Sequence, residues 1–218
     1  MSLGNSPVLG LVDYGSGNLR SVRQAIEQAG GHCAMVSSPG DAANCSALVV
    51  PGVGSFGDCA RQLHDAGLWE IIREWIVADR PYLGICLGYQ LLFESSEESP
   101  GVAGFGALAG KVVHFPRGEV GGEALKIPHM GWNQLHIRTP SDPLMKGFEI
   151  NPDFYFVHSY YPVPEDSSVV TSTCDYGVEF AASVTKGRMS GVQFHPEKSQ
   201  ALGLSMLRNF ISSLTSNP

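Results

Sequence analysis

Short apolar runs alternate with amphipathic stretches through the first half of the chain. The apolar runs are typical of buried strands, and they are Val8–Asp13, His32–Val36, Ala47–Val50 and Tyr82–Ile85. Apolar residues recur at helical spacing from Leu19 to Ala29 and again from Leu68 to Ile76. This alternation predicts right-handed crossovers and a parallel sheet with helices on both sides.

The second half is rich in strand patterns. The candidate strands are Lys111–Phe115, Trp132–Ile137, Asp153–Val157, Val169–Cys174, Phe180–Thr185 and Met189–Gln193. Lys186-Gly187-Arg188 reads as a hairpin turn, and Ser199–Ser213 reads as a closing helix. We therefore expect an α/β fold with a mostly parallel central sheet flanked by helices and a smaller antiparallel sheet in the second half.

Composition indicates one compact domain. The chain has 218 residues, of which 43% are apolar and 16% are charged, so a sizeable core is expected. Residues 8–218 show no repeat or linker and are predicted to form a single domain. Residues 1–7, with their Ser, Gly, Asn and Pro content, read as a disordered lead-in or a remnant that is not natural sequence.

The net charge and the cysteines limit the partners and the cellular compartment that are expected for this chain. The net charge of −7 argues against nucleic acid or an anionic membrane as the main partner. No apolar run is long enough to span a bilayer, and no cofactor is expected, because neither an ATP motif nor a metal cluster occurs. The five cysteines are odd in number and irregularly spaced, which favours free thiols in a reducing cytoplasm.

The segment Leu83–Gln90 combines a strand end, one cysteine and a helix start. A nucleophile on such a sharp turn is exposed at the top of the sheet. Gly84 and Gly88 lie two residues on either side of Cys86, and small residues are needed where the turn is tight. The helix start also directs free N–H groups and a positive dipole toward the sulfur. Cys86 is therefore the candidate nucleophile, rather than a small buried apolar residue.

A catalytic base has to come from elsewhere in the chain. In Gly191–Lys198, His195 follows an apolar strand and Glu197 comes two positions later. Alternate residues of an extended segment point the same way. Glu197 can then orient His195 and stabilise its imidazolium, which is the logic of a catalytic triad. A lone histidine at a strand end is usually structural, but this pairing favours catalysis.

Acyl transfer also needs donors for a developing oxyanion. The loop Gly52-Val53-Gly54 follows the third strand, so the Val53 amide is one candidate, and the Leu87 amide at the helix start is the other. The glycines have two alternative explanations: the loop needs them only for positive φ angles, or it cradles a phosphate. The phosphate-binding motif GxxxxGK[ST] is absent.

Together, Gly84–Gln90 and Gly191–Glu197 resemble the motifs of the class I, triad-type glutamine amidotransferases. The resemblance implies that Cys86 attacks the side-chain amide of glutamine, ammonia leaves, and water hydrolyses a glutamyl thioester. It also implies that Gly52, Gln90, Ser159 and Tyr160 hold the substrate, with Glu98 contributing. Tyr89 departs from the family, in which methionine is common there.

Further segments narrow the resemblance within this family. They are Asp13–Leu19, Pro51–Gly57, His129–Asn133, Tyr155–Tyr160 and Gln193–Ser199. The narrower match implies a heterodimer with a (β/α)₈ cyclase of the HisF type. That partner uses the ammonia to make imidazole glycerol phosphate and AICAR from PRFAR in histidine biosynthesis. Asn18, Trp132 and Lys198 are the candidate docking residues, although Lys198 is equally explained as a solvated charge.

Three alternatives stay open at this point. The chain could serve another synthase, such as one of anthranilate or GMP synthesis. It could be a γ-glutamyl hydrolase or cysteine peptidase, against which Gln90 and the lack of a second catalytic region argue. It could also be a non-enzymatic scaffold, which an intact set of Cys86, His195 and Glu197 disfavours.

Overall fold

The computed structural model describes residues 7–15, 17–120, 123–148 and 151–215. Residues 1–6 of the expected lead-in lie outside this part. Within it, no helix is long and apolar enough to cross a membrane. All five cysteines are buried free thiols, as the irregular spacing predicted.

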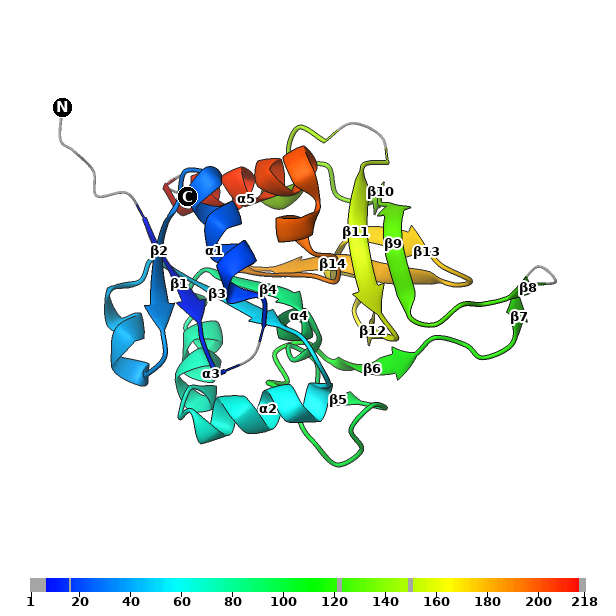
Figure 1. Cartoon of the computed structure of the whole chain (residues 1–218), viewed down its shortest axis with the longest axis horizontal. Coiled ribbons are helices and arrows are strands. Elements are labelled where there is room, and N and C mark those ends of the chain that lie inside the picture. Colours follow the sequence, from blue (N-terminus) through cyan, green and yellow to red (C-terminus); the bar gives the residue numbers. More distant parts are fainter. Residues whose placement is uncertain (1–6, 16, 121–122, 149–150, 216–218) are drawn as a thin grey trace.

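An eight-stranded sheet forms the centre of the fold (Figure 1). Its order is β10-β13-β14-β15-β4-β3-β1-β2. The pairs from β15 to β2 are parallel, and those from β10 to β15 are antiparallel. The strands are β1 Val8–Val12, β2 His32–Val36, β3 Ala47–Gly52, β4 Tyr82–Cys86, β10 His136–Ile137, β13 Val170–Asp175, β14 Glu179–Lys186 and β15 Met189–Val192.

Helices cover both faces of this sheet (Figure 1). One face carries α1 (Leu19–Gln28) and α5 (Gln200–Thr215), and the other carries α2 (Phe56–Asp65) and α3 (Trp69–Val77). The two-residue period of a strand explains the two cores. In β3, Leu48 and Val50 pack toward α2 and α3, whereas Ala47 and Val49 pack toward α1 and α5.

Smaller sheets stand at the carboxyl end of the parallel strands. In one, β9 (His129–Gln134) pairs antiparallel with β11 (Asp153–His158). The others contain β12 (Tyr160–Pro164), β6 (Gly110–His114) and β5 (Ser95–Ser96), and β7 (Glu119–Val120) with β8 (Glu123–Ala124). The short helices are α4 (Leu87–Gln90) and the 3₁₀ turns η1 (Pro39–Asn44), η2 (Pro143–Met145), η3 (Ser167–Val169) and η4 (Pro196–Lys198).

The α/β class and the mostly parallel sheet are confirmed. The antiparallel strands of the second half are only partly a separate sheet, because β14, β13 and β10 extend the central one. The expected single strand Trp132–Ile137 is wrong. Gln134 ends the pairing with β11, and His136 pairs instead with Thr173 of β13, so the chain changes sheets at buried Leu135.

The sequence patterns missed α2. A loop was expected at Gly52-Val53-Gly54 and no helix before Leu68, yet β3 extends to Gly52 and α2 begins at Phe56. Ser55 caps it by accepting a hydrogen bond from the Asp58 amide, the usual role of serine at a helix start. The Ser-x-x-Asp spacing was the available signal.

Candidate active site

Cys86 occupies a backbone conformation that side chains rarely adopt. It lies between β4 and α4 with φ 55° and ψ −106°, which costs of order 1–3 kcal/mol for a non-glycine residue. A Cβ on Gly84 would lie 2.4 Å from the Gly88 carbonyl oxygen, and one on Gly88 would lie 1.8 Å from that of Val50. Only glycine therefore lets the turn pack on β3, as expected from the sequence.

The helix after Cys86 is shorter than expected. α4 has four residues, Leu87–Gln90, all of them buried. One helical turn adds little macrodipole beyond its own first N–H groups. Any help for a thiolate therefore comes from local amides and side chains, rather than from a long helix dipole.

His195 and Glu197 form a buried pair. The His195 Nδ1 atom lies 2.8 Å from Glu197 Oε1, and each side chain is 3% exposed. The sequence placed both in one extended segment, but Glu197 lies in the 3₁₀ turn η4 and only His195 is extended. The main chain of His195 is held by its amide donating to the Tyr155 carbonyl and by its carbonyl accepting from the Ser199 hydroxyl.

Electrostatics favour a protonated His195. Burial lowers the pKa of His195, but Cys86 and Glu197 outweigh it and raise the pKa from 6.5 to about 10. Cys86 is the larger of the two raising influences. Both residues line the same cavity, although 109 positions separate them in the sequence (195 minus 86). The buried His195 Nε2 atom has no hydrogen-bond partner among the described residues.

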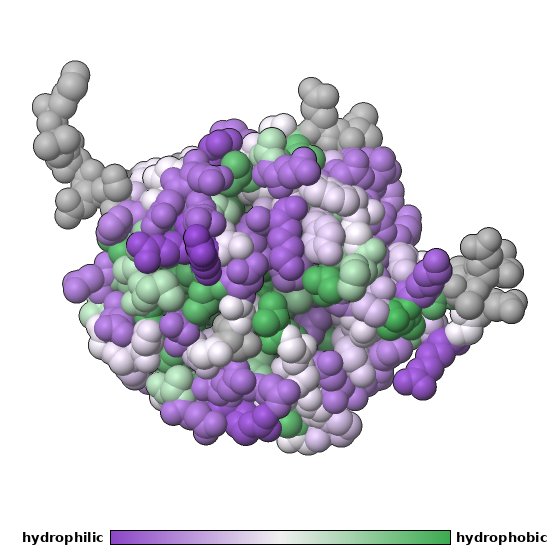
Figure 2. Space-filling model, viewed as in Figure 1, coloured by the Kyte–Doolittle hydropathy of each residue, from purple (hydrophilic) through white to green (hydrophobic). Residues whose placement is uncertain are grey.

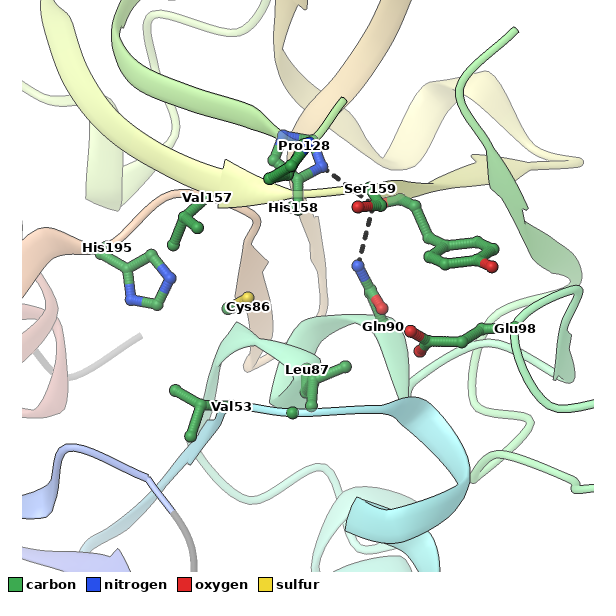
Figure 3. A pocket seen from close by; sticks show the side chains of 12 residues that line it. Val53, Cys86, Leu87, Gln90, Glu98, Pro128, Val157, His158, Ser159 and His195 are labelled. Atoms are coloured by element: carbon green, nitrogen blue, oxygen red, sulfur yellow. Dashed lines mark hydrogen bonds between the residues drawn. The ribbon is translucent and has the colours of Figure 1, made fainter. Parts of the chain in front are cut away.

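Cys86 and His195 open into one cavity of about 250 Å³, at the small end of ligand sites. Figure 3 shows His195 and Cys86 at one end and Gln90 and Glu98 at the other. The residues that line the cavity are Val53, Gly54, Cys86, Leu87, Gln90, Glu98, Pro128, Val157, His158, Ser159, Tyr160 and His195.

Most sequence-predicted site residues meet at this cavity, with two exceptions. Glu197 reaches it only through His195. Gly52 lies opposite Cys86 in the β3–β4 register, and unlike Val53 and Gly54 it does not line the cavity. A Cβ on Gly52 would lie 2.6 Å from the Leu87 Cβ, so its contribution here is close packing of the two segments.

Gln90 and Glu98 present polar atoms at the far end of the cavity. The Gln90 Nε2 atom donates to the Tyr160 carbonyl at 3.0 Å, whereas its buried Oε1 atom has no hydrogen-bond partner among the described residues. Glu98 accepts from the Phe56 amide at 2.7 Å, and burial raises the pKa of Glu98. This end suits a ligand that donates hydrogen bonds.

The predicted docking residues lie in β9, in η4 and at the start of α1. Trp132 in β9 is 48% exposed and makes an edge contact with the Tyr155 ring, with centroids 6.2 Å apart. The Lys198 Nζ atom lies 5.6 Å from the same ring. Asn18 lies at the start of α1, which packs against η4. Around the central hollow of this face, hydrophobic residues gather within a hydrophilic rim (Figure 2).

Two residues near the nucleophile were not anticipated from the sequence. The Tyr14 hydroxyl donates to the Pro51 carbonyl at 2.8 Å, below the Gly52–Gly54 loop. Gln193 is fully buried and contacts both Gln90 and Cys86. Gln193 lies two positions before His195, so the two-residue period that paired His195 with Glu197 was a signal for it as well.

Comparison with known proteins agrees with this site. The family model for "Glutamine amidotransferase class-I" matches residues 10–214. The chain belongs to the class I glutamine amidotransferases, and it is an enzyme of that family.

Curated relatives match over nearly the whole chain. One from Syntrophotalea carbinolica, "Imidazole glycerol phosphate synthase subunit HisH", is 48% identical over 92% of this chain and 97% of its own length. The protein of the same name from Geobacter sulfurreducens is 47% identical over 93% of this chain and 97% of its own.

Solved structures share the fold at much lower identity. The structure of PurLQS from Thermotoga maritima has a TM-score of 0.73 and 20% identity, and covers 96% of this chain and all (100%) of that one. A glutamine amidotransferase from the same organism has a TM-score of 0.67 and 13% identity, with 98% of this chain and 100% of that one covered.

Proposed function

We propose that this chain is the glutaminase subunit of an imidazole glycerol phosphate synthase in histidine biosynthesis, acting in the cytoplasm. It hydrolyses L-glutamine to L-glutamate and ammonia. The observation that carries the proposal is one small cavity lined by Cys86 and His195, with Glu197 paired to the His195 ring behind it. The identity of 43–48% to proteins named as HisH subunits supports this particular synthase.

The roles follow from the chemistry of each group. Cys86 attacks the carboxamide carbon of glutamine, and His195, held protonated, donates a proton to the departing ammonia. Glu197 fixes the His195 tautomer and stabilises the imidazolium. Water then attacks the thioester carbonyl with His195 as base. The amides of Val53 and Leu87 are the proposed donors to the oxyanion of each tetrahedral intermediate.

The far end of the cavity fits the amino-acid end of glutamine. The α-ammonium group is a donor, and it finds acceptors in Glu98 and the free Gln90 Oε1. Ser159 and Tyr160 supply main-chain groups along the opposite wall, and the Gly52 loop closes the site. An acceptor-rich end of this kind selects free glutamine over a peptide-bound residue, whose nitrogen is acylated.

The relatives are named as one subunit of a synthase, which implies a partner subunit. We propose that this partner is a (β/α)₈ cyclase of the HisF type that receives the ammonia directly. Ammonium predominates in water at neutral pH and is not nucleophilic, so direct transfer preserves reactive ammonia. Asn18, Trp132 and Lys198 are proposed to contact that subunit.

Ammonia release with and without a cyclase subunit tests the proposal. We expect hydrolysis of L-glutamine that rises when the cyclase is added, and little activity toward γ-glutamyl peptides or casein. Equal turnover with and without the cyclase would contradict the partnership. Activity on casein that exceeds activity on glutamine would point instead to a peptidase.

A further inference from the structure

Gln193 joins the two ends of the cavity by side-chain hydrogen bonds. Its Oε1 atom accepts from Gln90 Nε2 at 3.0 Å, and its Nε2 atom donates to the Cys86 sulfur at 3.6 Å. Gln193 is wholly inaccessible to solvent, and Gln90 is 2% exposed. Water therefore cannot replace either bond, and losing one would leave a buried polar group unpaired.

The direction of these bonds is set by a main-chain carbonyl. The Tyr160 carbonyl oxygen only accepts, so Gln90 has to turn its NH₂ group toward it. The second hydrogen of that NH₂ group then faces Gln193, so Gln193 has to accept it with its side-chain carbonyl oxygen. Its own NH₂ group is left facing the sulfur of Cys86.

A buried histidine pair fixes the same carbonyl from the other side. His158 Nδ1 lies 2.9 Å from the Tyr160 oxygen, and His158 Nε2 lies 3.0 Å from His129 Nδ1. The bonds from His158 and Gln90 to this carbonyl are the dashed lines of Figure 3. Asn133 Nδ2 approaches His129 Nε2 at 3.1 Å and donates to the Asp175 carbonyl.

Each donor in this chain of bonds is determined. Burial lowers the pKa of His158 to about 3 and that of His129 to about 4, so both rings are neutral and each has one donor and one acceptor. His158 donates to Tyr160 through Nδ1, His129 donates to His158, and Asn133 donates to His129. No alternative set of tautomers satisfies all three bonds.

We propose that Gln193 is a positioning residue that holds the Gln90 carbonyl toward the substrate and donates a hydrogen bond to the Cys86 sulfur. The inference rests on the proposed function, because it assigns a purpose to Gln193 within that site. One buried amide thereby orients the Gln90 group that faces the amino-acid end of glutamine and also supplies a hydrogen-bond donor to the sulfur of the nucleophile.

The sharpest variant is Gln193→Glu in the full-length chain. Glutamate has the same shape and can still accept from Gln90, but its carboxylate cannot donate to the sulfur. Gln193→Met, which has similar length and neither donor nor acceptor, carries the test if the glutamate variant does not fold. Gln24→Glu, on the exposed face of α1, makes the same chemical change away from the site.

The first readout is alkylation of Cys86 by iodoacetamide between pH 5 and 9, followed peptide by peptide with mass spectrometry. We expect the pH midpoint to rise by at least about one unit in both Gln193 variants, the size of a hydrogen bond to a charged group. Gln24→Glu should leave the midpoint in place. Because the carboxylate of Gln193→Glu would also repel a thiolate, Gln193→Met decides: if Gln193 only filled space, the midpoint in that variant would not move.

The second readout is glutamine hydrolysis with the cyclase subunit present. In Gln193→Met we expect kcat to fall by between about tenfold and a hundredfold, and KM to rise because Gln90 is no longer held. Folded variants with the wild-type midpoint and wild-type kinetics would overturn the inference. Failure of wild-type glutamine hydrolysis would instead refute the proposed function, and alkylation would still report on the Gln193–Cys86 contact.

Discussion

Gly203 of α5 packs directly on the main chain of Pro196, the residue between His195 and Glu197. A Cβ on Gly203 would lie 1.9 Å from the Pro196 carbonyl oxygen. The long C-terminal helix therefore supports η4 at the point where the candidate base and its carboxylate partner are presented. Nothing in the spacing of apolar residues along α5 pointed to this contact.

Gly203→Ala is expected to reduce both stability and turnover. Alanine gains up to about 1 kcal/mol in helix propensity, but overpacking a rigid main-chain contact costs about 1–3 kcal/mol or more. The overpacking should outweigh the gain in helix propensity, so we expect a lower free energy of unfolding in urea and slower glutamine hydrolysis. Gly40→Ala, where a Cβ meets nothing within 4 Å, is the control. Equal stability of both variants would contradict the packing argument.

Cys86→Ala should abolish glutamine hydrolysis, by at least about a thousandfold, while the fold is retained. Cys59→Ala is a useful comparison, because that buried thiol bonds to Tyr14 and does not line the cavity. Ammonia release and circular dichroism check the two expectations. Retained turnover in the Cys86 variant would refute the nucleophile assignment.

Glu197→Gln should be milder than His195→Ala, with at least about tenfold more residual turnover. The first change removes an orienting carboxylate, whereas the second removes the acid and base itself. Glutamine hydrolysis measured for both variants in the presence of the cyclase makes the comparison. An equal loss in the two variants, or the reverse order, would contradict the assigned roles.

The raised pKa of His195 predicts a pH dependence of stability. Its value of about 10 in the folded chain lies above the ordinary 6.5, so the folded state binds the proton more tightly. The stabilisation is complete below pH 6.5 and is lost as the pH rises toward 10. Urea unfolding of wild type relative to His195→Gln should show this decline.

The rise in the pKa of His195 should be smaller in Cys86→Ala. Burial lowers this pKa, and Cys86 is the largest of the influences that raise it. Titration of the His195 ring by NMR measures it. We expect a lower pKa in that variant than in wild type. An unchanged titration would mean that sulfur and imidazole do not interact.

Trp132→Ala should weaken binding of the cyclase subunit by about 2 kcal/mol, or roughly thirtyfold in Kd, as for an aromatic anchor in an interface. Val77→Ala changes another exposed apolar residue, 81% accessible, at the end of α3 and away from the site mouth. Titration calorimetry with the cyclase compares the two. A larger effect at Val77 would place the interface elsewhere.

Local patterns predicted most of the fold. Each parallel strand of the central sheet is a short apolar run, and the glycines around Cys86 correctly signalled a tight strand-to-helix turn. The division of Trp132–Ile137 could not be predicted, because β9 and β10 share one continuous pattern and only their partners Tyr155 and Thr173 distinguish them.

The candidate site was predictable where neighbours in sequence act together. His195 with Glu197 is such a case. Gln193, His158 and Tyr14 were missed because their roles depend on partners up to 107 positions away, which local sequence patterns do not reveal. The roles of the three predicted docking residues stay predictions, although Trp132 and Lys198 contact the same tyrosine ring.

The strand that leads into His195 is inserted in the interior of the sheet, with β4 on one side and β14 on the other. During synthesis the earlier strands therefore keep an open edge at β4 until β15, which follows much later in the chain, has been made. Long-range closure of this kind slows folding and exposes unpaired backbone. A nascent chain that has not yet made β15 also lacks the strand that presents His195.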